Sequence, residues 1–79
     1  MPQWTVLSRA GCTLCEQMLE ELAAALPAAD AARVEIIDIA DHPDLEAKYG
    51  RRIPVLLADG DFVCAYRLDG ERLRGYLQD

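Results

Sequence analysis

The sequence lacks any long hydrophobic run and is poor in several residue types. No apolar stretch approaches the ~18 residues of a membrane-spanning helix. The first residues, MPQWTVLSRAG, have no basic start followed by an apolar stretch, as a secretory signal would. Tryptophan, phenylalanine and histidine occur once each, yet hydrophobic residues make up 52% and charged residues 28% of the chain. This composition predicts one globular domain over residues 1–79, in the cytoplasm and away from membranes.

Positive charge is also scarce. Eight lysines and arginines stand against 14 aspartates and glutamates, which gives a net charge of -6 and argues against nucleic-acid binding. Residues 1–47 hold only two of the bases, so most of the cations lie in the C-terminal half. Those that could meet an anionic ligand are Lys48, Arg51, Arg52 and Arg67. Such basic side chains more commonly belong to a solvated surface than to a ligand site. We expect the protein to be a monomer.

Cysteine is present in an odd number, three. Disulfide-stapled secreted domains more often carry four, six or eight. Cys12 and Cys15 form a C-x-x-C pair, which in a reducing compartment is more often catalytic or metal-binding than structural. The third cysteine, Cys64, alternates with Phe62 and Tyr66, and this pattern predicts a small buried residue on one face of a strand.

Runs rich in β-branched and aromatic residues predict strands at residues 3–8, 33–39, 55–58 and 62–66. Trp4, in the first strand, is expected in the core. Asp59-Gly60 is a strong hairpin signal, so the last two strands should be antiparallel.

A helix is predicted over residues 13–26, because apolar residues recur there at spacings of three and four. They are Leu14, Met18, Leu19, Leu22 and Leu26. Thr13 and Glu16 fit a capping box at its start, and Pro27 ends it.

Two further helices follow. One has Pro43 in its first turn and Gly50 as its stop. The other is capped by Asp69, with Leu73, Tyr76 and Leu77 facing inward. The order β-α-β-α-β-β-α, with a right-handed crossover between parallel first and second strands, predicts an α/β fold with a mixed four-stranded sheet.

This element order places Cys12 at the N-terminal end of the first helix, where unpaired N–H groups and the helix dipole favour a thiolate. We expect Cys12 to be the exposed nucleophile and Cys15, one turn further in on the same side as Leu14, to be the sheltered resolving thiol. Two alternatives remain: a pair of structural cysteines, and a metal site. The metal site is disfavoured because structural zinc wants four ligands, and Cys64 and His42 are the only other soft ones.

The stretches TVLSRAGCTLCEQM and RRIPVLLADGDFV resemble the glutaredoxin-like proteins of the thioredoxin-fold superfamily, in particular a small bacterial group with a C-x-x-C motif. The resemblance covers nearly all of the chain. It implies a three-layer, glutaredoxin-type fold in which Pro54 is cis and lies against Cys12. It also implies that the backbone of Ile53 holds a thiol substrate in an extended pose.

The chain departs from the family pattern in two places. Thr13 and Leu14 stand between the cysteines where glutaredoxins usually carry proline and tyrosine, and they are expected to line the substrate site. Cys64 and Ala65 stand where the family has a glycine pair that holds glutathione. Arg9 is a candidate for attracting the carboxylates of that tripeptide.

The resulting hypothesis is a thiol–disulfide oxidoreductase or electron carrier that needs no bound cofactor, with glutathione as one candidate reductant. Its partner would be a disulfide-containing protein or a small thiol. A redox-responsive binding module with little turnover and a metal or iron–sulfur carrier are the alternatives.

Overall fold

The computed structural model describes residues 2–77, in which four strands form one mixed sheet of order β2-β1-β3-β4. The strands are β1 (Trp4–Ser8), β2 (Glu35–Asp38), β3 (Val55–Ala58) and β4 (Asp61–Ala65). β1 and β2 run parallel, whereas β3 is antiparallel to both β1 and β4. The predicted mixed four-stranded sheet is confirmed.

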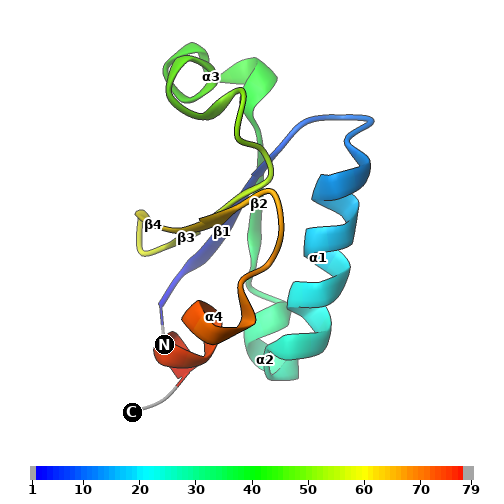
Figure 1. The fold of residues 1–79 in the computed structure, drawn as a ribbon, viewed down its shortest axis with the longest axis vertical. Helices are drawn as coiled ribbons and strands as arrows, with labels where there is room; N and C mark the ends of the chain where they lie inside the picture. Colours follow the sequence, from blue (N-terminus) through cyan, green and yellow to red (C-terminus); the bar gives the residue numbers. More distant parts are fainter. Residues whose placement is uncertain (1, 78–79) are drawn as a thin grey trace.

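Helices cover both faces of this sheet (Figure 1). They are α1 (Thr13–Ala25), α2 (Ala28–Ala31), α3 (Pro43–Tyr49) and α4 (Gly70–Leu77), with a 3-10 turn, η1 (Ile39–Asp41), before α3. Buried side chains of α1 and α4 belong to one core cluster, and those of η1 and α3 belong to another. Because adjacent residues of a strand point to opposite faces, the two clusters lie on opposite sides of the sheet.

The two core clusters explain why both central strands, β1 and β3, are buried along their whole length. The first consists of Trp4, Val6, Met18, Leu22, Leu26, Leu56, Ala58, Val63, Cys64 and Leu73. The second consists of Leu7, Ile39, Tyr49, Val55 and Leu57. All five residues of β1 are buried, since the strand has a helical layer on each side. The expectation that Trp4 lies in the core is confirmed.

The first helix begins and ends within one residue of its predicted bounds, but the predicted capping box is wrong. Cys12 is the N-cap, and its sulfur accepts a hydrogen bond from the Cys15 amide at 3.2 Å. Leu14 was expected on the buried side, yet it is 38% exposed. The buried face of α1 is defined by Cys15, Met18 and Leu22, and Leu14 lies about 100° around the helix from Cys15.

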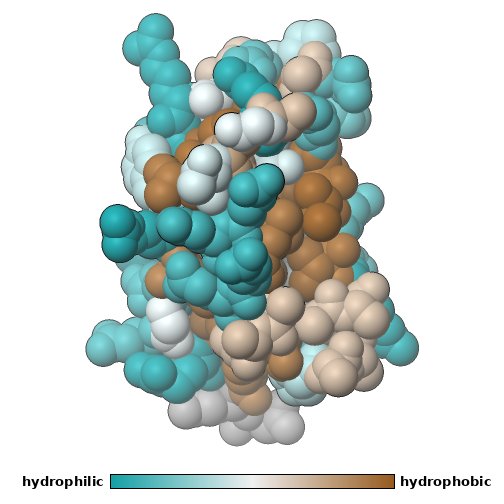
Figure 2. Space-filling view, turned by 90° about the vertical axis from the view of Figure 1, so that its right-hand side faces the viewer, coloured by the Kyte–Doolittle hydropathy of each residue, from teal (hydrophilic) through white to brown (hydrophobic). Residues whose placement is uncertain are grey.

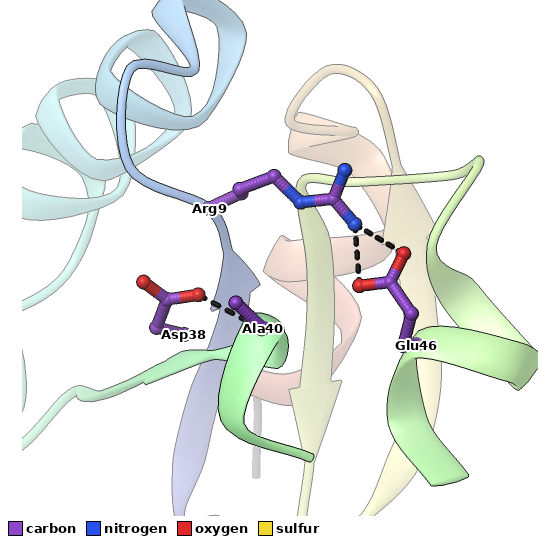
Figure 3. Close-up of polar contacts among 4 residues, drawn as sticks. All are labelled: Arg9, Asp38, Ala40 and Glu46. Atoms are coloured by element: carbon purple, nitrogen blue, oxygen red, sulfur yellow. Dashed lines mark hydrogen bonds and ion pairs between the residues drawn. The ribbon is translucent and has the colours of Figure 1, made fainter. Parts of the chain in front are cut away.

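The second strand is shorter than predicted. The Asp38 carboxylate accepts a hydrogen bond from the Ala40 amide at 2.9 Å, which turns the chain into η1 (Figure 3). Helix α2 was not predicted. Its alanine-rich segment starts directly after Pro27, whose fixed φ suits a helix start, and alanine has the highest helix propensity.

A β-bulge in the last strand overturns the predicted alternation of Phe62, Cys64 and Tyr66. Leu57 pairs with Phe62 and Leu56 pairs with Cys64, so Val63 is the extra residue. As a result Val63 and Cys64 are both buried, whereas Phe62 is 43% exposed. Tyr66 leaves the strand with a φ of 70°. The burial of Cys64 itself is confirmed.

The predicted cap of the last helix is confirmed, because the Asp69 carboxylate accepts hydrogen bonds from the amides of Glu71 and Arg72. Tyr76 was expected to face inward but is 40% exposed. Its ring stands edge-on to Trp4, with the centroids 5.6 Å apart, and so closes one edge of the core.

The α1 side of the molecule shows hydrophobic surface next to hydrophilic side chains (Figure 2). A hollow of about 210 Å³ is lined by apolar side chains of α1, α2 and β2 and by Val34, which lies between α2 and β2. Ile36, on the edge strand β2, is 56% exposed. Within residues 2–77, no helix is long and apolar enough to cross a membrane.

Candidate functional site

Two chain segments meet at the end of the sheet where β1 finishes and β3 begins (Figure 1). β1 and β3 are antiparallel and pair Leu7 with Val55. One further step along each strand places Ser8 across from Pro54. The turn that leads into α1 therefore lies beside the residues that precede β3. Gly11 allows that turn with a φ of 79°, a conformation that glycine adopts without strain.

Cys12 and Cys15 are joined by a disulfide at the start of α1, with their Cα atoms 5.2 Å apart. Cys12 is half-buried, whereas Cys15 is only 2% exposed. The Cys12 amide donates to the carbonyl of Arg9 at 3.2 Å, which closes the turn around the outer cysteine. An incoming sulfur can thus approach Cys12 more easily than Cys15.

The segment before β3 contains the proline that the family resemblance singled out. The Ile53–Pro54 bond is cis, as predicted, and Pro54 is fully buried. Ile53 is half-buried and packs against the core cluster that contains Tyr49. That Pro54 lies against Cys12 stays a prediction.

The remaining predicted site residues surround the disulfide in different ways. Thr13 and Leu14, between the cysteines, are both exposed. Arg9 lies outside the sheet, and its guanidinium forms an ion pair with the Glu46 carboxylate of α3 (Figure 3). A carboxylate ligand approaching Arg9 would have to compete with Glu46.

Tyr66 is a residue at this end of the sheet that the sequence reasoning missed. Its hydroxyl donates to the carbonyl of Arg51 at 3.1 Å, and its amide donates to the carbonyl of Pro54 at 2.9 Å. Tyr66 therefore ties the end of β4 to the segment before β3. A tyrosine in a left-handed conformation has no signal in a single sequence, since glycine or asparagine would be expected there.

The third cysteine is chemically distinct from the first two. Cys64 is a free thiol and is 4% exposed. Burial raises the pKa of the Cys64 thiol above its ordinary value of 9.0, and the negative charge of Asp69 adds to this. A backbone hydrogen bond at Asp69 and the charge of Arg72 act in the opposite direction. At neutral pH Cys64 is thus a protonated, sheltered thiol of low reactivity.

No group of three or more histidine, cysteine, aspartate or glutamate side chains within the described part of the chain is placed to hold a metal ion. The only sulfur pair there is the Cys12–Cys15 disulfide. This pair can interconvert between a dithiol and a disulfide.

Comparison with known proteins assigns the family. Residues 3–78 match the glutaredoxin-like domain (DUF836) family. The uncharacterized protein Rv0508 of Mycobacterium tuberculosis is 36% identical over 77 residues, which span 92% of this chain and 79% of the relative. The solution structure of Ne2328 from Nitrosomonas europaea is similar, with a TM-score of 0.84 and 33% identity, over 99% of this chain and 94% of the other.

A second solved structure, the X-ray structure of protein XcR50 from X. campestris, has a TM-score of 0.73 and 35% identity, and covers 94% of this chain and 93% of its own. The glutaredoxin-type fold that the sequence resemblance implied is thereby confirmed. The chain belongs to the glutaredoxin-like domain (DUF836) family and carries a C-x-x-C disulfide at the start of its first helix.

Proposed function

We propose that the protein is a thiol–disulfide oxidoreductase in which Cys12 is the nucleophile and Cys15 is the resolving thiol. The observation that carries this proposal is the Cys12–Cys15 disulfide at the start of α1, in which the outer cysteine is half-buried and the inner one is buried. The helix N-terminus favours negative charge on the outer sulfur, and the Cys15 amide donates a hydrogen bond to it.

The reaction consists of two exchanges. The Cys12 thiolate attacks one sulfur of a substrate disulfide, forms a mixed disulfide and releases one substrate thiolate, which takes up a proton from water. Cys15 then loses its proton and attacks Sγ of Cys12, which releases the second substrate thiol. The substrate disulfide gains two electrons and two protons, and the dithiol becomes the Cys12–Cys15 disulfide.

Single-cysteine variants test these roles. The fully reduced protein is mixed with a peptide disulfide, and the products are identified by intact mass. Cys15→Ser should accumulate a mixed disulfide on Cys12, whereas Cys12→Ser should show no exchange. Cys64→Ser is the matched control and should react like the unchanged protein, because Cys64 is buried.

Retained exchange in Cys12→Ser would contradict the assignment of the nucleophile. One mixed disulfide per chain without release of the second thiol in the unchanged protein would instead favour a redox-responsive binding module. Mass measurement after mild oxidation gives a further check, because the Cys12–Cys15 pair should lose two hydrogens and regain them with reductant.

The reductant that regenerates the dithiol is a second part of the proposal. The residues that replace the family's glycine pair are the buried Cys64 and the half-buried Ala65, followed by the bulky Tyr66. We expect glutathione to reduce the disulfide less efficiently than a thioredoxin-type dithiol protein does. Saturable, efficient reduction by low millimolar glutathione would overturn this expectation.

A further inference from the structure

A hollow of about 540 Å³ lies where the β1–α1 turn faces the C-terminal end of α3 and the loop after it. Most of its charged lining is cationic. The residues that line it are Arg9, Glu46, Ala47, Lys48, Gly50, Arg51 and Arg52. Four positive side chains and one carboxylate thus surround a hollow in a chain whose net charge is -6.

Two of the segments that line this hollow lead along the chain toward the redox site. Arg9 belongs to the turn that Cys12 closes, since the Cys12 amide donates to the Arg9 carbonyl. Arg51 and Arg52 directly precede Ile53 and Pro54, the segment that lies across from the end of β1. A polypeptide whose sulfur reaches Cys12 would therefore place its neighbouring residues over these cations.

The backbone that carries the two arginines is held by two hydrogen bonds. The Arg52 amide donates to the Tyr49 carbonyl at 2.7 Å, and the Arg51 carbonyl accepts the hydroxyl of Tyr66 at 3.1 Å. The cations thus stand on an ordered loop, which reduces the entropy lost when a ligand binds them.

The one carboxylate in the lining is already engaged. Glu46 pairs with Arg9, and Gly50 leaves the space that this carboxylate occupies: a Cβ atom at Gly50 would lie 2.7 Å from Oε1 of Glu46. Within residues 2–77, Lys48, Arg51 and Arg52 form no ion pair with a carboxylate. The hollow therefore presents three uncompensated positive charges and a fourth that Glu46 holds in check.

We propose that this cationic hollow selects polypeptide disulfides whose reactive cysteine is flanked by aspartate or glutamate residues. The inference rests on the proposed function, because it assigns a substrate class to the Cys12 site. An acidic segment can offer more carboxylates than a small tripeptide thiol, and four cations from separate segments match such a run. Complementary charge raises the rate of encounter and orients the substrate sulfur toward Cys12.

The test uses three synthetic peptides of equal length with one central cysteine flanked by Glu, Gln or Lys. Each cysteine carries a 2-thiopyridyl group. The Cys12 thiolate attacks the peptide sulfur and expels 2-thiopyridone, which is followed by absorbance. Cys15 then releases the peptide thiol. The reduced protein itself supplies the two electrons, so single-turnover rates need no other reductant. Each rate is divided by the rate with 2-mercaptoethanol, which removes differences in intrinsic peptide reactivity.

The variants separate the hollow from the rest of the surface. Arg51→Gln/Arg52→Gln removes two of its charges, and Glu46→Gln releases Arg9. Arg33→Gln is the control, because it removes one arginine charge by the same substitution near Trp4, at the opposite end of β1. Its effect is compared with the loss per charge in the double variant. Thermal unfolding verifies that each variant is folded.

The normalised rate should be about tenfold higher for the Glu peptide than for the Lys peptide at low salt, and the difference should shrink as salt is added. The double variant should lose about threefold in rate per charge with the Glu peptide only, since exposed ion pairs are individually weak. Glu46→Gln should raise the Glu-peptide rate about twofold, by the same electrostatic reasoning. Arg33→Gln should change none of the rates.

Equal normalised rates for the three peptides, or a loss in Arg33→Gln as large as the loss per charge in the double variant, would overturn the inference and leave the proposed function standing. If no peptide releases thiopyridone, the proposed function itself fails. The 2-thiopyridyl disulfide of glutathione forms a further arm. If it reacts as fast as the Glu peptide and with the same dependence on Arg51 and Arg52, the hollow selects the tripeptide and the polypeptide proposal is wrong.

Discussion

Replacement of Leu73 by alanine should expose the thiol of Cys64 without unfolding the rest of the protein. Leu73 is 1% exposed and is the only buried residue of α4 within the described part of that helix. Cys64 lies in the same core cluster as Leu73. The backbone of Asp69, the residue that caps α4, is hydrogen-bonded to the Cys64 thiol. Detachment of α4 should therefore uncover the thiol.

The expected magnitude follows from the burial of Leu73. Replacing a fully buried leucine by alanine costs about 2.7–5 kcal/mol, because the removed side chain loses its transfer free energy and leaves a cavity. A domain of 79 residues has a free energy of unfolding of about 4–12 kcal/mol. A loss of about 3 kcal/mol in the attachment of α4 would raise the population of its detached form about 10²-fold, since 1.36 kcal/mol is a factor of ten.

The assay is the rate of alkylation of Cys64 in the oxidised protein, where the Cys12–Cys15 disulfide leaves Cys64 as the free thiol. Iodoacetamide labelling is followed by intact mass under native conditions. The rate should rise about 10²-fold in Leu73→Ala if opening is fast relative to alkylation.

Ile39→Ala is the matched control. Ile39 is 0% exposed but belongs to the core cluster on the other face of the sheet. It should lower the global stability by a similar amount, because its side chain is equally buried. The alkylation rate of Cys64 should then rise less than in Leu73→Ala. Equal rates in the two variants would refute the reasoning, since they would mean that Cys64 is reached only by global unfolding.

Two further predictions concern stability. The disulfide closes a loop of only four residues, so the loss of chain entropy in the unfolded state should raise the free energy of unfolding of the oxidised form by about 2 kcal/mol, or its Tm by roughly 10 °C. Calorimetry of both redox forms measures this difference, and a reduced form that melted at the same or a higher temperature would contradict it. Burial raises the pKa of Cys64 above its ordinary value of 9.0; the charge of Asp69 adds to this and the charge of Arg72 opposes it. The folded state therefore retains the Cys64 proton more strongly than the unfolded state does. This contribution to stability is complete below about pH 9 and is lost as pH rises through the raised pKa; a Cys64→Ala variant whose Tm fell just as steeply above pH 9 would contradict the assignment.

Local sequence patterns predicted most of the secondary structure. The spacing of apolar residues located α1 within one residue, and the Asp59-Gly60 turn predicted the antiparallel pairing of β3 with β4. These features are set by neighbours along the chain, so a single sequence contains the information. The same holds for the Cys12–Cys15 pair, because its separation of three residues at a helix start is a local property.

The errors occurred where a side chain found an unforeseen partner. Cys12 took the N-cap position from Thr13, and the Asp38 carboxylate ended β2 early by binding the Ala40 amide. The bulge at Val63 changed which residues of β4 face the core. In each case one hydrogen bond or one extra residue outweighed a pattern that propensity alone favoured.

The sequence by itself determined that the chain folds as an α/β domain with a dithiol at the start of its first helix. The tertiary structure alone decided what surrounds that dithiol. Arg9 meets Glu46 across 37 positions of sequence, and Tyr66 reaches Arg51 across 15. The Tyr66–Arg51 contact follows from the antiparallel pairing of β3 with β4. The Arg9–Glu46 contact follows from the antiparallel pairing of β1 with β3, which brings the end of one strand beside the start of the other. Charges that are scattered along the sequence become a cationic hollow only through that pairing, and no local pattern encodes it.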